Sequence, residues 1–390
     1  MRAIPIVLLA SVLPLAGLHP FDSTARAEAG SIAAAALHGV PTTRIRVLLF
    51  EADGRVVVSD RRGAHEIVAV ADGVRVGGGP VRADWRSDWS DAPLQVRSSS
   101  VRGAIEVVPL GGEKLAVVNE VPLESYLQGT LGAEMYASWS SAALQAQAVA
   151  SRTYALRHMR ERNGQIWHVR AGTQSQVYGG VSAESDAVRR AVRATEGEIL
   201  VHGGEPILAA FHSSSGGQTA SSKEVWGTAK AYLVSAAVED DWESPDAYWR
   251  AEVSRGTLGR AVASVDREIG PIHDAAVLER TSSGRVARLR LTGDRGAVTL
   301  SGTELRRALG ETTLKSTLFE VKGSHDGFVF VGSGSGHGVG MSQWGARAMA
   351  LRGDSYRDIL RAFYPGAALR SMLDTPVAQL GDVSTLGDLR

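Results

Sequence analysis

The residue pattern of the chain changes once, at Pro122, and this change constrains the fold more than any other feature. Between residues 44 and 121, short β-branched runs alternate with turn residues, as expected for strands joined by tight turns. Three glycine-containing pairs stand where hairpins would turn: Asp53-Gly54, Asp72-Gly73 and Gly111-Gly112. The sequence therefore predicts a small β-rich N-terminal module.

Helical patterns dominate after Pro122. A short helix is expected over residues 123–128, ending at Gly129, and a long Ala- and Ser-rich helix over residues 140–160. Small side chains let neighbouring backbones approach closely, so the long helix is expected to be buried. Further helices are predicted over residues 185–194, 301–309 and from Ser355, and strands over residues 198–201, 207–211, 250–253, 286–291 and 297–300. The expected fold class is α+β, with the β-rich module followed by a mixed α+β core.

The first 27 residues have the pattern of a secretory signal, with an apolar run up to Leu18 and an A-x-A site ending at Ala27. The apolar run is short for a membrane span. The chain has no cysteine, which excludes a lipoprotein thiol, a disulfide framework and a thiolate metal site. We therefore expect an exported protein of the periplasm or cell-wall space of a bacterium.

The chain has 390 residues, more than one hydrophobic core usually organises. Lys plus Arg and Asp plus Glu number 42 each, so no net charge attracts nucleic acid. The expected division is a signal peptide (1–27), a linker (28–42), a β-rich module (43–117), a main domain (118–370) with an inserted α+β segment at about 245–325, and a C-terminal tail (371–390).

Glu134 is the first candidate for chemistry. It lies between the two expected helices, among Leu131, Met135, Tyr136 and Trp139. Apolar neighbours disfavour the charged carboxylate and raise its pKa, which would let Glu134 donate a proton near neutral pH. A surface carboxyl beside a helix is the alternative.

Two further polar segments contain candidate binding residues. Residues 211–219 form a Ser- and Gly-rich loop with His212, Ser213 and Ser214, followed by Trp226, which offers an aromatic face. Residues 334–345 place His337 among glycines, which would let the backbone approach a ligand closely. A flexible turn and a structural histidine are the alternatives.

Other kinds of site fit these segments poorly. The glycines around His337 lack the Lys-Ser/Thr of a phosphate loop, and an exported protein has no nucleotide supply. His212 or His337 could pair with a serine of the loop, but no G-x-S-x-G motif is present. No H-x-x-x-H or H-E-x-x-H pair is present to hold a metal, which leaves metal hydrolysis a minor alternative.

Taken in order, the motifs resemble the core of the SpoIID/LytB family (stage II sporulation protein D). The resemblance spans about residues 119–365 and rests on these segments: 121–127 with 132–135, 144–154, 174–178, 211–219 with 225–227, and 336–346. It implies a peptidoglycan lytic transglycosylase that cuts glycan strands, often ones stripped of stem peptides, with Glu134 as the catalytic acid and base.

The alternative implied by the resemblance is a glycan-binding protein without activity of its own that enhances a cell-wall amidase. The expected partners are peptidoglycan glycan strands and, under the alternative, an amidase; no nucleic acid or nucleotide is expected. No cofactor is expected either, because zinc in some relatives is held by Cys and His, and only His168 lies near the corresponding segment here. Candidate substrate-binding residues are Gln145, Arg152, Gln176, Tyr178, His212, Ser213, Ser214, Trp226, His337 and Gln343.

Overall fold

The computed structural model describes residues 43–372 except 240, 266 and 267. The expected signal peptide, the linker and all but the first two residues of the expected tail lie outside the described residues. None of the helices within the described ranges is long and apolar enough to cross a membrane. Helices and strands are mixed along the chain, which confirms the α+β fold class.

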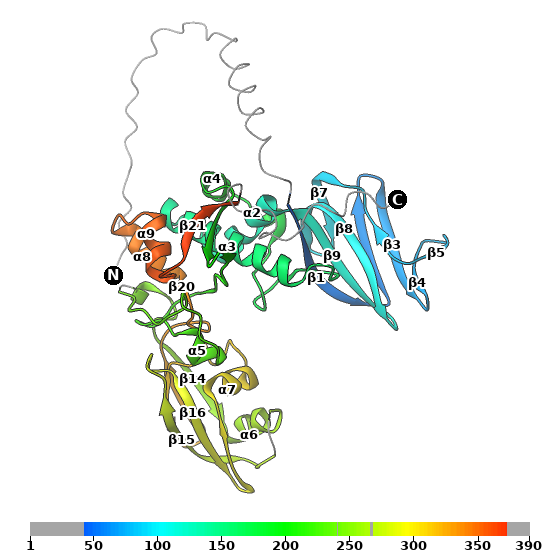
Figure 1. The fold of residues 1–390 in the computed structure, drawn as a ribbon. Coiled ribbons are helices and arrows are strands. Elements are labelled where there is room, and N and C mark those ends of the chain that lie inside the picture. Colours follow the sequence, from blue (N-terminus) through cyan, green and yellow to red (C-terminus); the bar gives the residue numbers. More distant parts are fainter. Residues whose placement is uncertain (1–42, 240, 266–267, 373–390) are drawn as a thin grey trace, which may run out of the picture. The chain divides into compact units, whose positions relative to one another are not determined.

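The N-terminal part is a curled ten-stranded sheet (Figure 1). Its strands follow the order β10-β1-β9-β8-β7-β2-β3-β4-β5, and β6 pairs with β8. Their bounds are β1 Arg44–Asp53, β2 Arg55–Asp60, β3 Gly63–Val70, β4 Gly73–Val76, β5 Val81–Arg82, β6 Trp85–Arg86, β7 Ser90–Val96, β8 Ser99–Gly111, β9 Lys114–Pro122 and β10 Val169–Arg170. Strand β9 runs through the expected boundary between residues 117 and 118.

Two of the three predicted hairpins form. Asp72-Gly73 joins β3 to β4, and Gly111-Gly112 joins β8 to β9. The hairpin predicted at Asp53-Gly54 is wrong, because β1 pairs with β9 and β10 whereas β2 pairs with β3 and β7. Gly54, at φ +70°, instead lies where the chain leaves β1 and enters β2, which pairs with different strands of the sheet.

The predicted short helix is longer than expected. Helix α2 covers Leu123–Glu134, so Gly129 does not end it. A Cβ at Gly129 would lie 2.6 Å from the Tyr178 ring, and one at Gly132 would lie 1.9 Å from the Ala183 carbonyl oxygen. These glycines therefore serve close packing inside the helix, and Glu134 becomes its last residue.

The long helix is confirmed as α3 (Ser141–Glu161), and its alanines are buried in the largest apolar cluster. Around it lie α4 (Asp186–Ala194), α8 (Gln343–Leu351) and α9 (Tyr356–Phe363), with short elements η1 (Gly180–Ala183), α5 (Ser222–Trp226) and η2 (Asp241–Glu243). Two small sheets complete this part: β12 (Glu205–Pro206), β11 (Glu198–His202) and β21 (Ala368–Ser371), and β13 (Phe211–His212) with β20 (Met341–Ser342).

The strand predicted over residues 207–211 is wrong for most of its length. The N–H groups of Ala209 and Ala210 donate to carbonyls two residues earlier, and that of Leu208 donates to the Tyr232 hydroxyl. These local bonds replace a strand ladder until Phe211.

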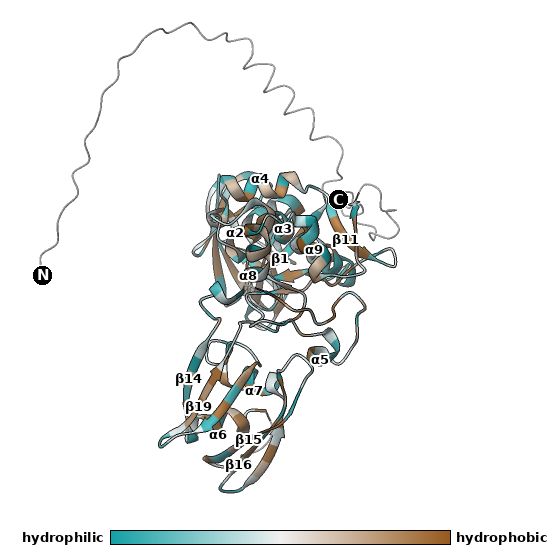
Figure 2. Ribbon diagram, turned by 90° about the vertical axis from the view of Figure 1, so that its left-hand side faces the viewer, coloured by the Kyte–Doolittle hydropathy of each residue, from teal (hydrophilic) through white to brown (hydrophobic). Residues whose placement is uncertain are grey.

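Residues 249–332 have an apolar cluster of their own, with hydrophobic residues along the strands (Figure 2). The sheets are β14 (Trp249–Ser254), β19 (Gly327–Gly332) and β18 (Phe319–Gly323), and β15 (Ile272–Arg280), β16 (Val286–Gly293) and β17 (Gly296–Leu300). The helices are α6 (Arg255–Ala263) and α7 (Gly302–Leu309). The capping boxes that begin α7 and α9, at Ser301 and Ser355, form as their sequences predict.

Candidate functional site

Glu134 is held by two neutral donors at the C-terminal end of α2. Its Oε1 accepts a hydrogen bond from the Val177 N–H at 2.6 Å, and its Oε2 accepts one from Nε2 of Gln343 at 3.3 Å. Burial raises the pKa of Glu134 above its ordinary value, and these two bonds only partly oppose that effect. A carboxyl in this setting retains its proton to a higher pH than an exposed glutamate.

Three of the sequence motifs meet at this carboxyl. Glu134 comes from α2, Val177 from the segment after β10, and Gln343 from the first turn of α8. Ser342 caps α8, since its Oγ accepts from the Gly345 N–H at 3.1 Å. The cap fixes the residue that precedes Gln343 and thereby the direction from which the amide approaches Glu134.

An aromatic cluster, formed by Tyr136, Trp139 and Trp344, adjoins the carboxyl along the chain. The Trp139 ring lies 5.6 Å from Tyr136 and 4.9 Å from Trp344, and 63% of Tyr136 is exposed. The Arg347 guanidinium lies 5.8 Å from the Trp139 ring and 5.2 Å from that of Trp344, and it is paired with Glu243. Trp139 and Trp344 are half-buried, and aromatic rings at a surface present flat apolar faces on which a sugar can stack.

Sequence reasoning noted Tyr136 and Trp139 as apolar neighbours of Glu134, but it left Trp344 out of the site. The signal was present, because Trp344 directly follows Gln343 in the same motif.

The serine loop, residues 211–219, is held in place by hydrogen bonds to Asp241, which lies outside the loop. Oδ2 of Asp241 accepts from the Ser215 N–H at 2.6 Å, the Ser215 hydroxyl at 2.5 Å and the Gly216 N–H at 3.1 Å. Ser214 is buried, and its Oγ accepts from the Ser244 hydroxyl at 3.0 Å. Ser213 is half-buried. Its carbonyl accepts from the backbone N–H of Trp344 at 3.0 Å, and this bond joins the loop to the aromatic cluster.

His212 and His337 lie with their ring centroids 5.7 Å apart. Nδ1 of His212 donates to the Val339 carbonyl at 3.2 Å, whereas Nδ1 of His337 accepts from the Val339 N–H at 3.0 Å. Burial lowers the pKa of both, that of His337 to about 4, so both rings are neutral near pH 7. Within the described ranges neither ring is hydrogen-bonded to the hydroxyls of residues 213–215, so the serine-hydrolase pairing does not form. The Trp226 ring, 41% exposed, lies 5.4 Å from His337.

Arg152, Gln176 and Tyr178 are engaged inside the fold rather than at the Glu134 carboxyl. Arg152 is fully buried and donates to both oxygens of Glu124 at 2.7 Å. Oε1 of Gln176 accepts from the Tyr126 hydroxyl at 2.9 Å, and the Tyr178 hydroxyl donates to Oδ1 of Asn119 at 2.9 Å. These contacts position the elements around the site. Gln145 lies half-buried on α3.

The residues near Val177 do not fit a zinc site. Nδ1 of His168 already accepts from the Arg46 N–H at 3.0 Å. In the part of the chain that the structure describes, no group of three or more His, Asp or Glu side chains could hold a metal ion.

Comparison with known proteins gives two family matches. A model described as stage II sporulation protein matches residues 111–202, and one described only as a domain of unknown function matches residues 226–340.

Three similar relatives are bacterial proteins. An uncharacterized protein of Brachyspira hyodysenteriae is 32% identical over 68% of this chain and 70% of its own length. Stage II sporulation protein D of Bacillus amyloliquefaciens is 32% identical over 64% of this chain and 74% of its own length. The amidase enhancer of Bacillus subtilis is 34% identical over 63% of this chain, but this chain covers only 40% of that longer protein.

Proposed function

This chain belongs to the stage II sporulation protein D family, and from that premise we propose that it is a peptidoglycan lytic transglycosylase. It would cleave the bond between N-acetylmuramyl and N-acetylglucosaminyl units of glycan strands, with Glu134 as the single acid and base. The observation that carries the proposal is a partly buried carboxyl, with a raised pKa, between two neutral hydrogen-bond donors.

The absence of a charged partner bears on the type of reaction. Burial raises the pKa of Glu134, the bonds from Val177 and Gln343 lower it, and within the described residues no hydrogen bond joins it to a second carboxyl. Hydrolysis of a glycosidic bond normally uses two carboxyl groups, about 5–5.5 Å apart in retaining enzymes and about 6.5–9.5 Å apart in inverting ones. One carboxyl suffices when the nucleophile is part of the substrate.

The proposed steps need no other reactant. Protonated Glu134 gives its proton to the glycosidic oxygen, and the bond between that oxygen and the muramyl anomeric carbon breaks. The glucosaminyl unit leaves with a new hydroxyl. The Glu134 carboxylate then removes the proton from the muramyl 6-hydroxyl, whose oxygen bonds to the anomeric carbon and closes a 1,6-anhydro ring. Glu134 is protonated again, ready for the next bond.

The aromatic cluster supplies the binding surface in this proposal. Tyr136 lies two residues after Glu134, and Trp344 directly follows Gln343, whose amide donates to the Glu134 carboxylate. Stacking of a sugar ring on these faces would hold the strand while the carboxyl acts.

The test uses purified glycan strands without stem peptides. Mass spectrometry is expected to find 1,6-anhydromuramyl ends after incubation with the native protein and none with Glu134→Gln. Ordinary reducing ends would instead indicate hydrolysis and contradict the proposal.

A second candidate function is stimulation of an amidase, favoured by the similarity to a relative named amidase enhancer. In that case the protein would release no glycan product, yet it would raise the rate at which a purified cell-wall amidase releases stem peptides. Glu134→Gln would leave this stimulation unchanged.

Both functions place the protein outside the cytoplasm, in keeping with the signal-like residues 1–27. Cell fractionation with N-terminal sequencing of the mature chain tests this: export is expected with cleavage after Ala27.

A further inference from the structure

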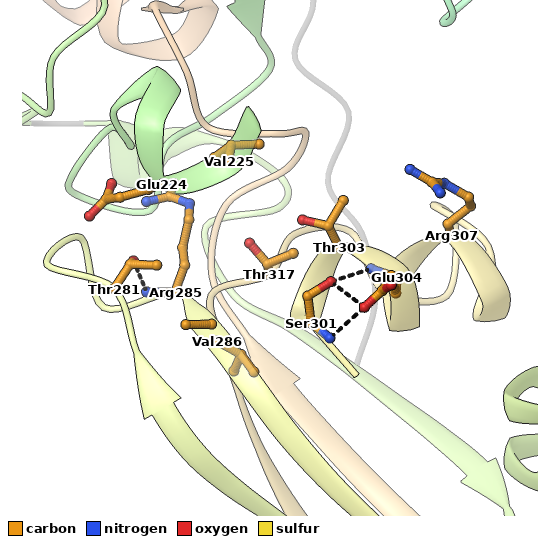
Figure 3. Close-up of a pocket in the computed structure, with 11 residues that line it drawn as sticks. Glu224, Val225, Thr281, Arg285, Val286, Ser301, Thr303, Glu304, Arg307 and Thr317 are labelled. Carbon is orange, nitrogen blue, oxygen red and sulfur yellow. Dashed lines mark hydrogen bonds between the residues drawn. The ribbon is translucent and has the colours of Figure 1, made fainter. Parts of the chain in front are cut away.

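A cavity lies between α5 and the 249–332 segment. Its volume is about 330 Å³, near the lower end of the roughly 300–1,000 Å³ typical of ligand pockets. Its lining residues are Glu224, Val225, Thr281, Arg285, Val286, Ala287, Ser301, Thr303, Glu304, Arg307 and Thr317 (Figure 3). Glu134, Gln343 and the aromatic cluster do not line it, so it is distinct from the proposed catalytic site.

Three polar side chains of the cavity are free to bind a ligand: those of Thr303 and Arg307 are exposed to solvent, whereas Thr317 is nearly buried. Within the described ranges, the side chains of Thr303, Thr317 and Arg307 form no hydrogen bond or ion pair with the protein. Thr317 is only 9% exposed, and Figure 3 shows it with Thr303 in the middle of the cavity. Nε of Arg285, which also lines the cavity, is buried without a partner within the described residues, and a buried donor without a partner is unfavourable, so the cavity calls for a polar group.

The two carboxylates of the cavity differ in what they can still bind. Glu224 accepts from the Ser221 N–H, the Ser282 hydroxyl and the Ser283 N–H, which occupy both of its oxygens. Oε2 of Glu304 accepts from the N–H and the hydroxyl of Ser301. Its Oε1 has no partner within the described residues and can accept from a ligand hydroxyl.

Charge indicates the class of ligand. Glu224 and Glu304 oppose Arg285 and Arg307, so the formal charges of the lining cancel, 2 − 2 = 0. A neutral cavity that offers guanidinium donors, a carboxylate acceptor and hydroxyl groups suits a neutral ligand with many hydroxyls better than an anion.

We propose that this cavity binds one N-acetylated sugar unit of a glycan strand. Thr303, Thr317 and Glu304 bond to its hydroxyls, and Arg307 donates to its acetamido oxygen, while Val225 and Val286 contact the apolar face of the ring. The identity of the strand as peptidoglycan rests on the proposed function. This assigns a role to part of the region, residues 226–340, that matches a domain of unknown function.

The cavity is also joined to the serine loop through one buried side chain. Arg285 lines the cavity, and its two terminal nitrogens donate to the Ser215 and Gln218 carbonyls at 2.9 Å. A Cβ at Gly338 would lie 2.4 Å from the same guanidinium, so this glycine makes room for it. A sugar in the cavity therefore contacts a residue that holds the loop preceding Trp226.

The experiment titrates N,N′-diacetylchitobiose into the full-length protein and follows the methyl signals of Val225 and Val286 by NMR. These signals are expected to shift in a saturable way. Arg307→Ala, which removes a charged donor, is expected to weaken this binding about tenfold, and Thr317→Val, of nearly the same shape, a few fold. Arg290→Ala removes an exposed arginine elsewhere in the same segment and serves as the matched control, with unchanged affinity.

Methyl signals that stay in place at saturating probe would overturn the proposal, as would an equal loss of affinity in Arg290→Ala. Spectra of the ligand-free variants check that each remains folded. The binding measured in this way does not need turnover. Assaying glycan cleavage by the native protein beside it therefore separates the outcomes: chitobiose binding by a native protein that releases no 1,6-anhydromuramyl ends supports the cavity while the transglycosylase proposal fails.

Discussion

The two ends of helix α2 carry the same residue type in opposite settings. Glu124, in the first turn, receives two 2.7 Å bonds from the buried guanidinium of Arg152. Glu134, in the last turn, receives its bonds from a backbone N–H and an amide, both neutral, in the part of the chain that the structure describes. The helix dipole stabilises an anion at the first position and destabilises one at the second. One glutamate is thus held in place by a buried guanidinium, while the other can carry a proton.

The largest expected effect is the loss of activity when Glu134 is substituted. Glu134→Gln keeps the shape of the side chain but removes the titratable proton, so release of anhydromuramyl ends is expected to fall on the order of 10²–10⁴-fold. Glu196→Gln, at an exposed glutamate whose side chain has no hydrogen-bond or ion-pair partner within the described residues, serves as the control and is expected to be fully active. Equal activity in both variants would remove Glu134 from the chemistry.

The next largest effect is the loss of stability when Glu124 is substituted. Glu124→Ala leaves the buried Arg152 guanidinium without its carboxylate, which is expected to lower the free energy of unfolding by about 3–5 kcal/mol in urea denaturation. The matched variant Glu161→Ala breaks an exposed pair with Arg157 and is expected to cost less than about 1 kcal/mol. Similar losses in the two variants would contradict the structural role given to Glu124.

The pH dependence of stability has a definite sign. The pKa of Glu134 is raised in the folded protein, so the folded state binds more protons than the unfolded state between the ordinary glutamate pKa and the raised one. Stability is therefore expected to fall as pH rises through this window, by about 1.4 kcal/mol for each pKa unit of the shift. In Glu134→Gln this decline should be smaller, with the remainder due to Glu106, whose pKa burial also raises; a decline of unchanged size would contradict the raised pKa of Glu134.

Gln343→Leu sharpens the role of the amide. The bond from Gln343 favours the charged form of Glu134, so its loss is expected to raise the pKa of Glu134 further. The pH–rate profile should then move to higher pH, with a rate loss of about tenfold from the lost hydrogen bond to a charged group. An unmoved profile would show that the 3.3 Å contact does not affect the proton.

Tyr136→Ala is expected to have the smallest effect. The side chain is 63% exposed, so its removal should leave the unfolding midpoint unchanged while it weakens glycan binding by a few fold. Tyr248→Ala, at a tyrosine that is 82% exposed, provides the control. Equal binding by the two variants would exclude the aromatic cluster as a sugar platform.

Local patterns predicted much of the fold. The capping boxes at Ser301 and Ser355 and the Ala-rich α3 form where the sequence places them, because each depends on neighbours within a few residues. Gly129 was misassigned as a helix end, since a glycine that ends a helix and one that admits a neighbouring backbone look alike in sequence. Only the approach of Tyr178, 49 residues later, distinguishes them.

The candidate site was predictable in its centre and less so at its edges. The setting of Glu134 among apolar residues indicated a raised pKa, which the structure supports. Arg152 and Gln176 looked equally suited to bind a ligand, but a motif does not say which side of an element faces the carboxyl. Asp241 was missed because nothing local connects it to the Ser215 that it holds.

The bond between Gln343 and Glu134 joins groups 209 residues apart along the chain. Contacts of such high sequence separation form late in folding, because the entropy of closing the long intervening loop must be overcome first. Strand β13 precedes the 249–332 segment and β20 follows it. The two strands pair in parallel and so close a shorter loop that lies within the chain between Glu134 and Gln343. A nascent chain therefore acquires the bond between Gln343 and Glu134 only after α8 has been synthesised.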